Sequence, residues 1–153
     1  MNDADWDYFQ RELDSAAVTL LGRIGHEVNP NRRNRRRLIV SSSARGIETR
    51  ADGWWWNPAD VDIATALAAC APEGGKVAVP GGRRVFDLAH AIGWDAFHLT
   101  RARHVTVAAG IPCLTARSDA HPVEMLLREA GLVPGPTLPL DPQAGFDLTV
   151  WRR

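Results

Sequence analysis

Short apolar runs recur along this chain, and most of them are followed by a segment with helical spacing. Runs that are apolar at nearly every position are typical of strands buried on both faces. Strands are therefore expected at Ala17–Leu21, Leu38–Val40, Val77–Val79 and Ala96–Thr100, with an edge strand at Trp54–Trp56. Apolar residues three or four positions apart predict helices at Asp5–Leu13, Asp60–Cys70, Arg84–Ala91 and about Ser118 to Ala130, and a short helix from Gly22-Arg23 to His26.

The C-terminal segment has a different pattern, in which two strands follow each other without a helix between them. Leu132–Leu140 and Phe146–Arg152 predict two strands of an antiparallel hairpin, because turn-forming residues lie between them. Alternating strands and helices that finish in a hairpin predict the α/β class, with a central, mostly parallel sheet, flanking helices and a C-terminal antiparallel hairpin. With 153 residues and neither a linker nor a repeat, the chain is expected to form a single domain over residues 1–153.

Composition and charge limit the kinds of partner that this protein is expected to bind. Hydrophobic residues make up 45% and charged residues 24% of the chain, and no apolar run approaches the roughly 20 residues that a membrane helix needs. The 18 basic residues are balanced by 18 acidic ones, so no overall field attracts nucleic acid or a membrane surface. We therefore expect a cytoplasmic protein that acts on a small molecule, with no nucleic acid and no membrane among its partners.

Several local signals leave alternatives open. A cluster of arginines is either a solvated turn that enters a strand or an anion site built on one member, with Arg35 as the candidate: Arg32, Arg33, Arg35, Arg36 and Arg37. The tryptophans of Trp54–Trp56 either point into the core, which we favour, or stack on a ligand or form a homodimer contact. The five histidines show no ligand spacing, so no metal site is expected, and Cys70 and Cys113 lack the neighbours of a reactive thiol.

The segment from Val77 to Phe86 carries the clearest candidate chemistry. A short apolar run stops at Gly81-Gly82, and Arg83 and Arg84 open the following helix. Glycines let backbone N–H groups approach a ligand closely, a helix N-terminus favours anions, and arginine pairs with phosphate. The order therefore indicates a phosphate-bearing cofactor, although a glycine pair between a strand and a helix is also typical of a simple turn.

Six such segments in this order resemble the dihydrofolate reductase family. They are an acidic residue with an aromatic four positions later (Asp5 and Phe9), Leu21-Gly22-Arg23, Leu38 to Ser42, Val79 to Phe86, His98-Leu99-Thr100, and the closing strand Phe146 to Arg153. The resemblance runs from about Asp5 to Arg153. It implies a dihydrofolate reductase-like fold, NADPH as the cofactor, and a role in folate and one-carbon metabolism as an oxidoreductase.

The resemblance implies that NADPH is held by residues that follow three strands: Gly22, Arg23, Ser41, Ser42, Gly81, Gly82, Arg83 and Arg84. Gly22 and Arg23 would meet the cofactor phosphates, and the two serines would lie beside the 2′-phosphate. The peptide bond between Gly81 and Gly82 would lie close to the nicotinamide side of the cofactor. The resemblance allows either a trans or a cis form of this bond. Arg83 stands where the family carries a third glycine, and Arg83 or Arg84 would compensate by pairing with phosphate.

Four further residues are implied on the substrate side. Asp5 would hydrogen-bond the pterin and help to protonate its ring nitrogen, and Thr100 would support that carboxylate. Phe9 would pack on the bound ring, and Arg35 would hold the carboxylate of a folate tail. Each has a plainer structural interpretation: a helix cap for Asp5, a core residue for Phe9 and the end of a strand for Thr100.

The family's fold begins with a buried central strand and a mobile loop, and this sequence begins at the helix that follows them. Three explanations stay open: a longer natural protein, a strand borrowed from a partner chain, or a relative without catalysis. We favour the first, and expect weak or no turnover from the chain as it stands. The expected function is NADPH-dependent reduction of dihydrofolate or a related pterin. The alternatives are reduction of a ribosylamino-pyrimidine in riboflavin biosynthesis and a non-catalytic, oligomeric binding module.

Overall fold

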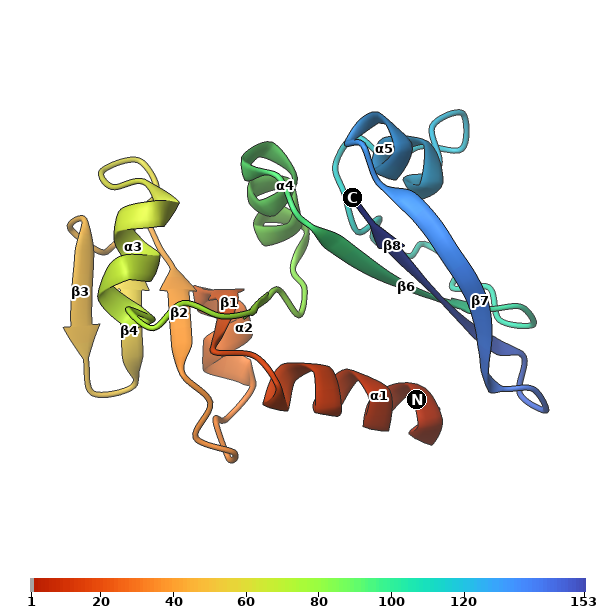
Figure 1. The fold of residues 1–153 in the computed structure, drawn as a ribbon, viewed down its shortest axis with the longest axis horizontal. Coiled ribbons are helices and arrows are strands. Elements are labelled where there is room, and N and C mark those ends of the chain that lie inside the picture. Colours follow the sequence, from red (N-terminus) through yellow and green to blue (C-terminus); the bar gives the residue numbers. More distant parts are fainter. Residues whose placement is uncertain (1) are drawn as a thin grey trace. The chain divides into compact units, whose positions relative to one another are not determined.

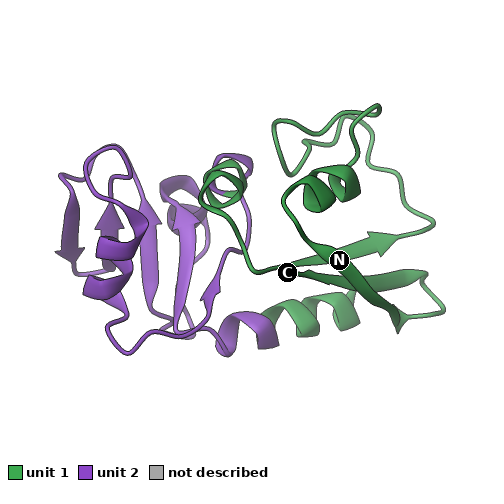
Figure 2. Cartoon of the chain, turned by 45° about the horizontal axis from the view of Figure 1, so that its top comes forward, with its two compact units in different colours: residues 1–10, 86–153 green, residues 11–85 purple. Residues whose placement is uncertain are grey.

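The computed structural model describes residues 2–153, which form two compact units (Figure 2). Unit 2 contains Arg11–Val85, and unit 1 contains the residues up to Gln10 together with Phe86–Arg153. The structure is of the mixed α/β class, with one five-stranded and one three-stranded sheet. The expectation of a single domain over the whole chain stays a prediction.

Unit 2 is built on a sheet with the strand order β3-β4-β2-β1-β5 (Figure 1). The strands are β1 (Val18–Gly22), β2 (Arg37–Val40), β3 (Ile47–Arg50), β4 (Gly53–Trp56) and β5 (Val77–Ala78). Four of them run parallel, and only β3 is antiparallel, paired to β4 through a tight hairpin. The sheet is therefore mostly parallel, as the apolar runs predict.

Helices α2 (Arg23–Val28) and α3 (Ile63–Cys70) lie on opposite faces of this sheet. The chain passes from β1 to β2 in one direction along the sheet and from β4 to β5 in the other, so right-handed crossovers place the two helices on different faces. The side chains of β4 show the same division. Trp55 contacts His26 of α2 edge-on, with 5.7 Å between ring centroids, whereas Trp56 donates its indole N–H to the Val61 carbonyl just before α3. Both tryptophans are buried, because each face of β4 is covered.

Unit 1 contains the second sheet, in which every pairing is antiparallel and the order is β6-β8-β7. Its strands are β6 (Ala96–Ala102), β7 (Val133–Asp141) and β8 (Phe146–Arg152). Helix α5 (Val123–Glu129) packs on it around a core of Phe97, Leu114, Val123, Leu126, Leu127, Leu132 and Trp151. Helices α1 (Asp3–Asp14) and α4 (Arg83–Ile92) each contribute residues to both units.

The C-terminal antiparallel hairpin is confirmed, but two details of the expected fold are wrong. Trp54–Trp56 is not an edge strand, because β3 pairs along its outer side. The hairpin does not edge the parallel sheet either: β8 pairs with β6 along seven residues, which draws Ala96–Thr100 into the second sheet. Both differences come from strand partners that a one-dimensional pattern does not specify.

Two helix starts also differ from expectation. Helix α3 begins at Ile63 instead of Asp60, because Asp62 caps it by accepting a hydrogen bond from the Thr65 backbone N–H at 2.7 Å. Helix α5 begins at Val123 instead of near Ser118, since Ser118 and His121 close a tight turn through reciprocal backbone hydrogen bonds. Across residues 2–153, no helix is long and apolar enough to span a bilayer.

Gly53, the first residue of β4, tests the register in which β4 pairs with β2. Its φ is +146°, and a Cβ placed there would lie 2.7 Å from Ile39 Cδ1 and 3.1 Å from the Arg37 carbonyl oxygen. We expect Gly53→Ala to lower the free energy of unfolding of unit 2 by about 2–3 kcal/mol. Urea denaturation followed by tryptophan fluorescence measures the change. The matched control is Gly25→Ala in α2, where nothing lies within 4 Å of the added methyl group. Equal stabilities for the two variants would contradict the assigned register.

Candidate functional site

The carboxyl ends of the parallel strands bring the predicted cofactor residues of unit 2 to one edge of the sheet. The β1–β5 ladder pairs Val18 with Val77 and Thr19 with Ala78, and the carboxyl ends of both strands lead to glycines, Gly22 and Gly81-Gly82. On the other side of β1, Gly22 pairs with Val40, the residue before Ser41. Segments far apart in the sequence therefore end side by side.

This edge is also where the strand order reverses. From β1 the chain moves to β2 and β4 on one side of β1, and it then returns to β5 on the other side. The connection that leaves β1 runs to β2, whereas the connection that leaves β5 runs through α4 to β6 of the other sheet. Ligands of α/β sheets bind outside the carboxyl ends of the strands, which makes this edge the candidate site. Gly22 is the last residue of β1, and Gly81 follows the neighbouring strand β5.

Two glycines of this edge lie close to Val85 at the start of α4. A Cβ on Gly22 would lie 3.2 Å from Cγ2 of Val85, and a Cβ on Gly82 would lie 3.8 Å from the same methyl group. The start of α4 thus packs against the end of β1 at positions without side chains. The helix dipole favours an anion at the N-terminus of α4.

The Gly81–Gly82 peptide bond is trans, so the cis option expected from the resemblance is wrong for this structure. The turn is made instead by positive φ angles, 147° at Gly81 and 92° at Gly82, which only glycine adopts at little cost. Arg83 and Arg84 follow in the first turn of α4, and both side chains are exposed.

Ser41, Ser42 and Arg23 differ in the hydrogen bonds that their side chains already make within the protein. The Ser41 hydroxyl is buried, lies 2.8 Å from the Ser43 hydroxyl and accepts a hydrogen bond from the Ser43 backbone N–H. Ser42 is exposed. Arg23 makes two hydrogen bonds to Glu27 at 2.8 and 3.0 Å, but its side chain is 48% exposed, so that pairing is a weak surface interaction.

The predicted substrate residues Asp5, Phe9 and Thr100 lie in unit 1. Asn2, rather than Asp5, caps α1, because its side-chain oxygen accepts the Asp5 backbone N–H at 3.1 Å. The Tyr8 hydroxyl shares a 2.6 Å hydrogen bond with Nδ1 of His98. Asp5 lies one helical turn before Tyr8, and Thr100 lies two residues after His98 on the same strand face. The α1 side that carries Asp5 therefore meets the β6 face that carries Thr100.

Two other predicted residues have close neighbours. Phe9 packs against Trp6, with 5.6 Å between ring centroids. Arg35 lies in unit 2 and binds one carboxylate oxygen of Asp14 through Nε at 2.8 Å and Nη2 at 2.7 Å, while Arg33 binds the other oxygen. The hydrogen bond from Arg35 is the largest of the effects that lower the pKa of Asp14. The candidate tail-binding guanidinium thus already has an anionic partner.

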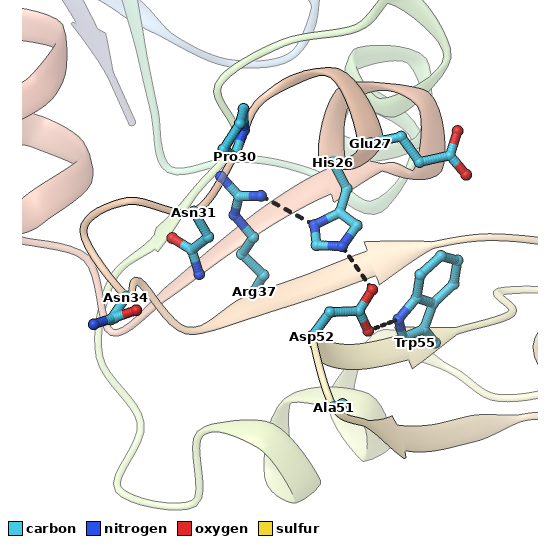
Figure 3. Close-up of a pocket in the computed structure, with 9 residues that line it drawn as sticks. All are labelled: His26, Glu27, Pro30, Asn31, Asn34, Arg37, Ala51, Asp52 and Trp55. Carbon is cyan, nitrogen blue, oxygen red and sulfur yellow. Dashed lines mark hydrogen bonds and ion pairs between the residues drawn. The ribbon is translucent and has the colours of Figure 1, made fainter.

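Sequence reasoning missed a second polar site, in unit 2 (Figure 3). His26 Nε2 lies 2.9 Å from the Asp52 carboxylate, Trp55 Nε1 donates to the other Asp52 oxygen at 2.9 Å, and Arg37 Nη1 lies 3.0 Å from His26 Nδ1. They line a pocket of about 550 Å³ together with Glu27, Pro30, Asn31, Asn34 and Ala51. These residues come from four separate segments with no ligand-like spacing, so only the fold could reveal the site.

Comparison of the sequence with protein-family models gives no match, and a search among curated proteins finds none that is significantly similar. No group of three or more histidine, cysteine or acidic side chains within residues 2–153 is placed to hold a metal ion.

The ion pairs of Asp14 with Arg33 and Arg35 lead to a testable prediction about the pKa of Asp14. Arg35→Gln removes the larger cause of the lowered pKa, so the pKa of Asp14 should rise toward its ordinary value, and Arg33→Gln should raise it less. A depressed carboxyl pKa stabilises the fold above the unfolded value and loses that contribution as the pH falls through the native value, below about pH 4. NMR titration of the Asp14 side-chain carboxyl carbon measures both variants. An equal or larger rise with Arg33→Gln would contradict the assignment.

Proposed function

We propose that this chain is an NADPH-dependent reductase of the dihydrofolate reductase type, acting on dihydrofolate or a related pterin. One observation carries the proposal: Gly22-Arg23 at the end of β1 and Gly81-Gly82-Arg83 after β5 lie at the carboxyl ends of two neighbouring parallel strands. A dinucleotide needs backbone close to its pyrophosphate and a helix N-terminus aimed at it. The glycines at Gly22 and Gly82, which carry no side chain beside Val85, and the start of α4 directly after Gly81-Gly82 support the proposal.

The choice of NADPH over NADH rests on polar groups beyond β2. The 2′-phosphate requires hydrogen-bond donors or cations where NADH has only a hydroxyl group. Ser42 is exposed just beyond the end of β2, and Arg23 follows the neighbouring strand β1. Arg83 and Arg84 add positive charge at the β5 side of the same edge, suited to the pyrophosphate.

In this proposal, the residues that act on the substrate belong to α1 and β6. When bound, NADPH supplies the hydride. Asp5 would hydrogen-bond the pterin and direct a proton to the ring nitrogen next to the carbon that is reduced, and Thr100 would orient the Asp5 carboxylate. The hydrogen bond between Tyr8 and His98 supports this pairing, since it joins the helix face and the strand face that carry the two residues. Phe9 would pack on the ring, and a substrate carboxylate would compete with Asp14 for Arg35.

A dinucleotide-binding module without turnover is the second candidate, because all eight proposed cofactor residues lie in unit 2. Cofactor binding therefore requires nothing from unit 1. In addition, β5 and β6 each have only one strand neighbour within the described residues, so both sheets end at an unpaired edge. Reduction of a ribosylamino-pyrimidine is the alternative reaction for the same cofactor edge.

Ser42→Ala tests the cofactor assignment. We expect it to weaken NADPH binding by about three- to tenfold through loss of a hydrogen bond to a charged group, and to leave NADH binding unchanged. Quenching of tryptophan fluorescence by each dinucleotide gives both dissociation constants. Ser118→Ala, an exposed serine of unit 1, is the matched control. Absence of saturable NADPH binding to the folded chain would overturn the proposal for both candidate functions.

Asp5→Asn separates the reductase from the binding module. If the chain turns over dihydrofolate, the variant should lower kcat at pH 7 by about 100-fold, the range expected for loss of a proton donor, with NADPH affinity unchanged. The matched control is Asp7→Asn, an exposed carboxyl group on the same helix. NADPH oxidation measured at 340 nm follows the reaction. NADPH binding without dihydrofolate-dependent oxidation in the native chain would favour the module.

A further inference from the structure

The pocket around His26 holds a buried arginine that the proposed reductase does not use. Arg37 is the first residue of β2 and is only 9% exposed. It lines the pocket of about 550 Å³ that Figure 3 shows. Among residues 2–153, no carboxylate lies within 4.0 Å of its guanidinium group. A buried cation without a directly bound counter-ion is costly, and an anion in the pocket would offset that cost.

One end of this guanidinium group is held in place by neutral acceptors. Arg37 Nη1 donates to the Asn29 carbonyl at 2.8 Å and to His26 Nδ1 at 3.0 Å. Arginine only donates, so Nδ1 of His26 must accept, and the neutral imidazole then donates its Nε2 proton to Asp52. The second Asp52 oxygen accepts the indole N–H of Trp55, and this hydrogen bond is the largest cause of the lowered pKa of Asp52. Asp52 therefore reaches Arg37 only through a neutral ring.

The other edge of the Arg37 guanidinium group, formed by Nε and Nη2, has no hydrogen-bond partner among the described residues. These two nitrogens are not enclosed in the core either. The enclosed side-chain atoms without a partner in the described chain are His90 Nδ1 and the indole nitrogens of Trp94 and Trp151. The Nε–Nη2 edge therefore opens into the space that Arg37 lines. Its two N–H groups point the same way, like a fork, and match two oxygens of one anion.

The Arg37 side chain belongs to the face of the sheet that α2 covers. His26 of α2 and Asn29, which directly follows α2, both bind it. Trp55, which contacts His26 edge-on, lines the pocket from the same face. Successive residues of an extended chain point to opposite faces, and Arg36, directly before β2, lines only a neighbouring hollow of about 640 Å³. Arg37 is therefore the one arginine of the pocket lining, and an anion there must bind to it alone.

The charges of the pocket favour an anion with a single charge. Burial is the largest cause that lowers the pKa of Arg37, and a bound anion would oppose that effect. Two carboxylates also line the pocket: Asp52, and Glu27, which is paired with Arg23 at 2.8 Å. They would repel a phosphate dianion more strongly than a monoanion. The two coplanar oxygens of a carboxylate fit the Nε–Nη2 fork of a single guanidinium group.

We propose that this pocket binds a small monocarboxylic acid, with its carboxylate on the Nε–Nη2 edge of Arg37. Pro30 and Trp55 of the lining provide apolar contacts for a short hydrocarbon body. The site is separate from the proposed anchor for a substrate carboxylate, because Arg35 lines only the neighbouring hollow and is bound to Asp14. The sequence left open whether the arginine cluster binds an anion through Arg35, and within that cluster Arg37 is the residue with an unpaired fork in a pocket.

NMR titration of the native chain with butyrate, inorganic phosphate and uncharged butanol tests the proposal. Butyrate should bind saturably and shift the Nε–H resonance of Arg37, because that group donates to the carboxylate, while the Nε–H resonance of Arg36 stays in place. Phosphate should bind more weakly than butyrate, and butanol should not bind. Stronger binding of phosphate, or no saturable shift at Arg37, would overturn the inference and leave the reductase proposal untouched.

Arg37→Lys tests the fork itself, because lysine keeps the positive charge but binds as a single point. We expect this variant to bind butyrate about tenfold more weakly than the native chain. The matched control is Arg36→Lys, the same change one position earlier and outside the pocket lining, which should leave butyrate binding unchanged. Circular dichroism shows whether each variant is folded, and the titration of the native chain decides the matter if Arg37→Lys does not fold. Equal losses in the two folded variants would contradict the assignment to Arg37.

Discussion

Burial of β1 on both faces, with a strand paired along each side, is the constraint on which unit 2 depends. Val18, Thr19, Leu20 and Leu21 are all buried, so the strand must have parallel neighbours on both sides and a helix on each face. Once β2 and β5 are fixed as those neighbours, the glycine that ends β1 and the glycines that follow β5 come to the same edge of the sheet. The candidate cofactor edge is thus a consequence of core packing.

The opposite edge shows how polar groups tie the same sheet together. Asp52 sits in the turn between β3 and β4, yet it binds His26 of α2 and Trp55 of β4, and His26 in turn orients Arg37 at the start of β2. A helix, a hairpin and a central strand are therefore joined by one chain of hydrogen bonds. Such a network has a cost unless every member is satisfied, and Arg37 is the member whose charge has no directly bound counter-ion.

Unit 1 follows a different principle. Its antiparallel sheet is stabilised by one apolar cluster between the strands and α5, and the long segment between β6 and α5 is anchored by Leu114, which is 1% exposed. The indole N–H groups of Trp94 and Trp151 and the Nδ1 atom of His90 are buried without a hydrogen-bond partner. Trp94 packs against Phe97, with 5.0 Å between ring centroids, so the polar atoms lie within an aromatic core.

By itself the sequence determined the α/β class, the parallel strands and the terminal hairpin, because continuous apolar runs and turn residues are local signals. It also singled out Gly81-Gly82, whose positive φ angles are a local requirement of the backbone that glycine meets. Only the tertiary structure decided that β3 covers Trp54–Trp56, that β6 joins the hairpin, and that Arg37, His26 and Asp52 meet. The physical reason is that strand pairing and buried polar contacts depend on partners far away in the chain, which no local pattern encodes.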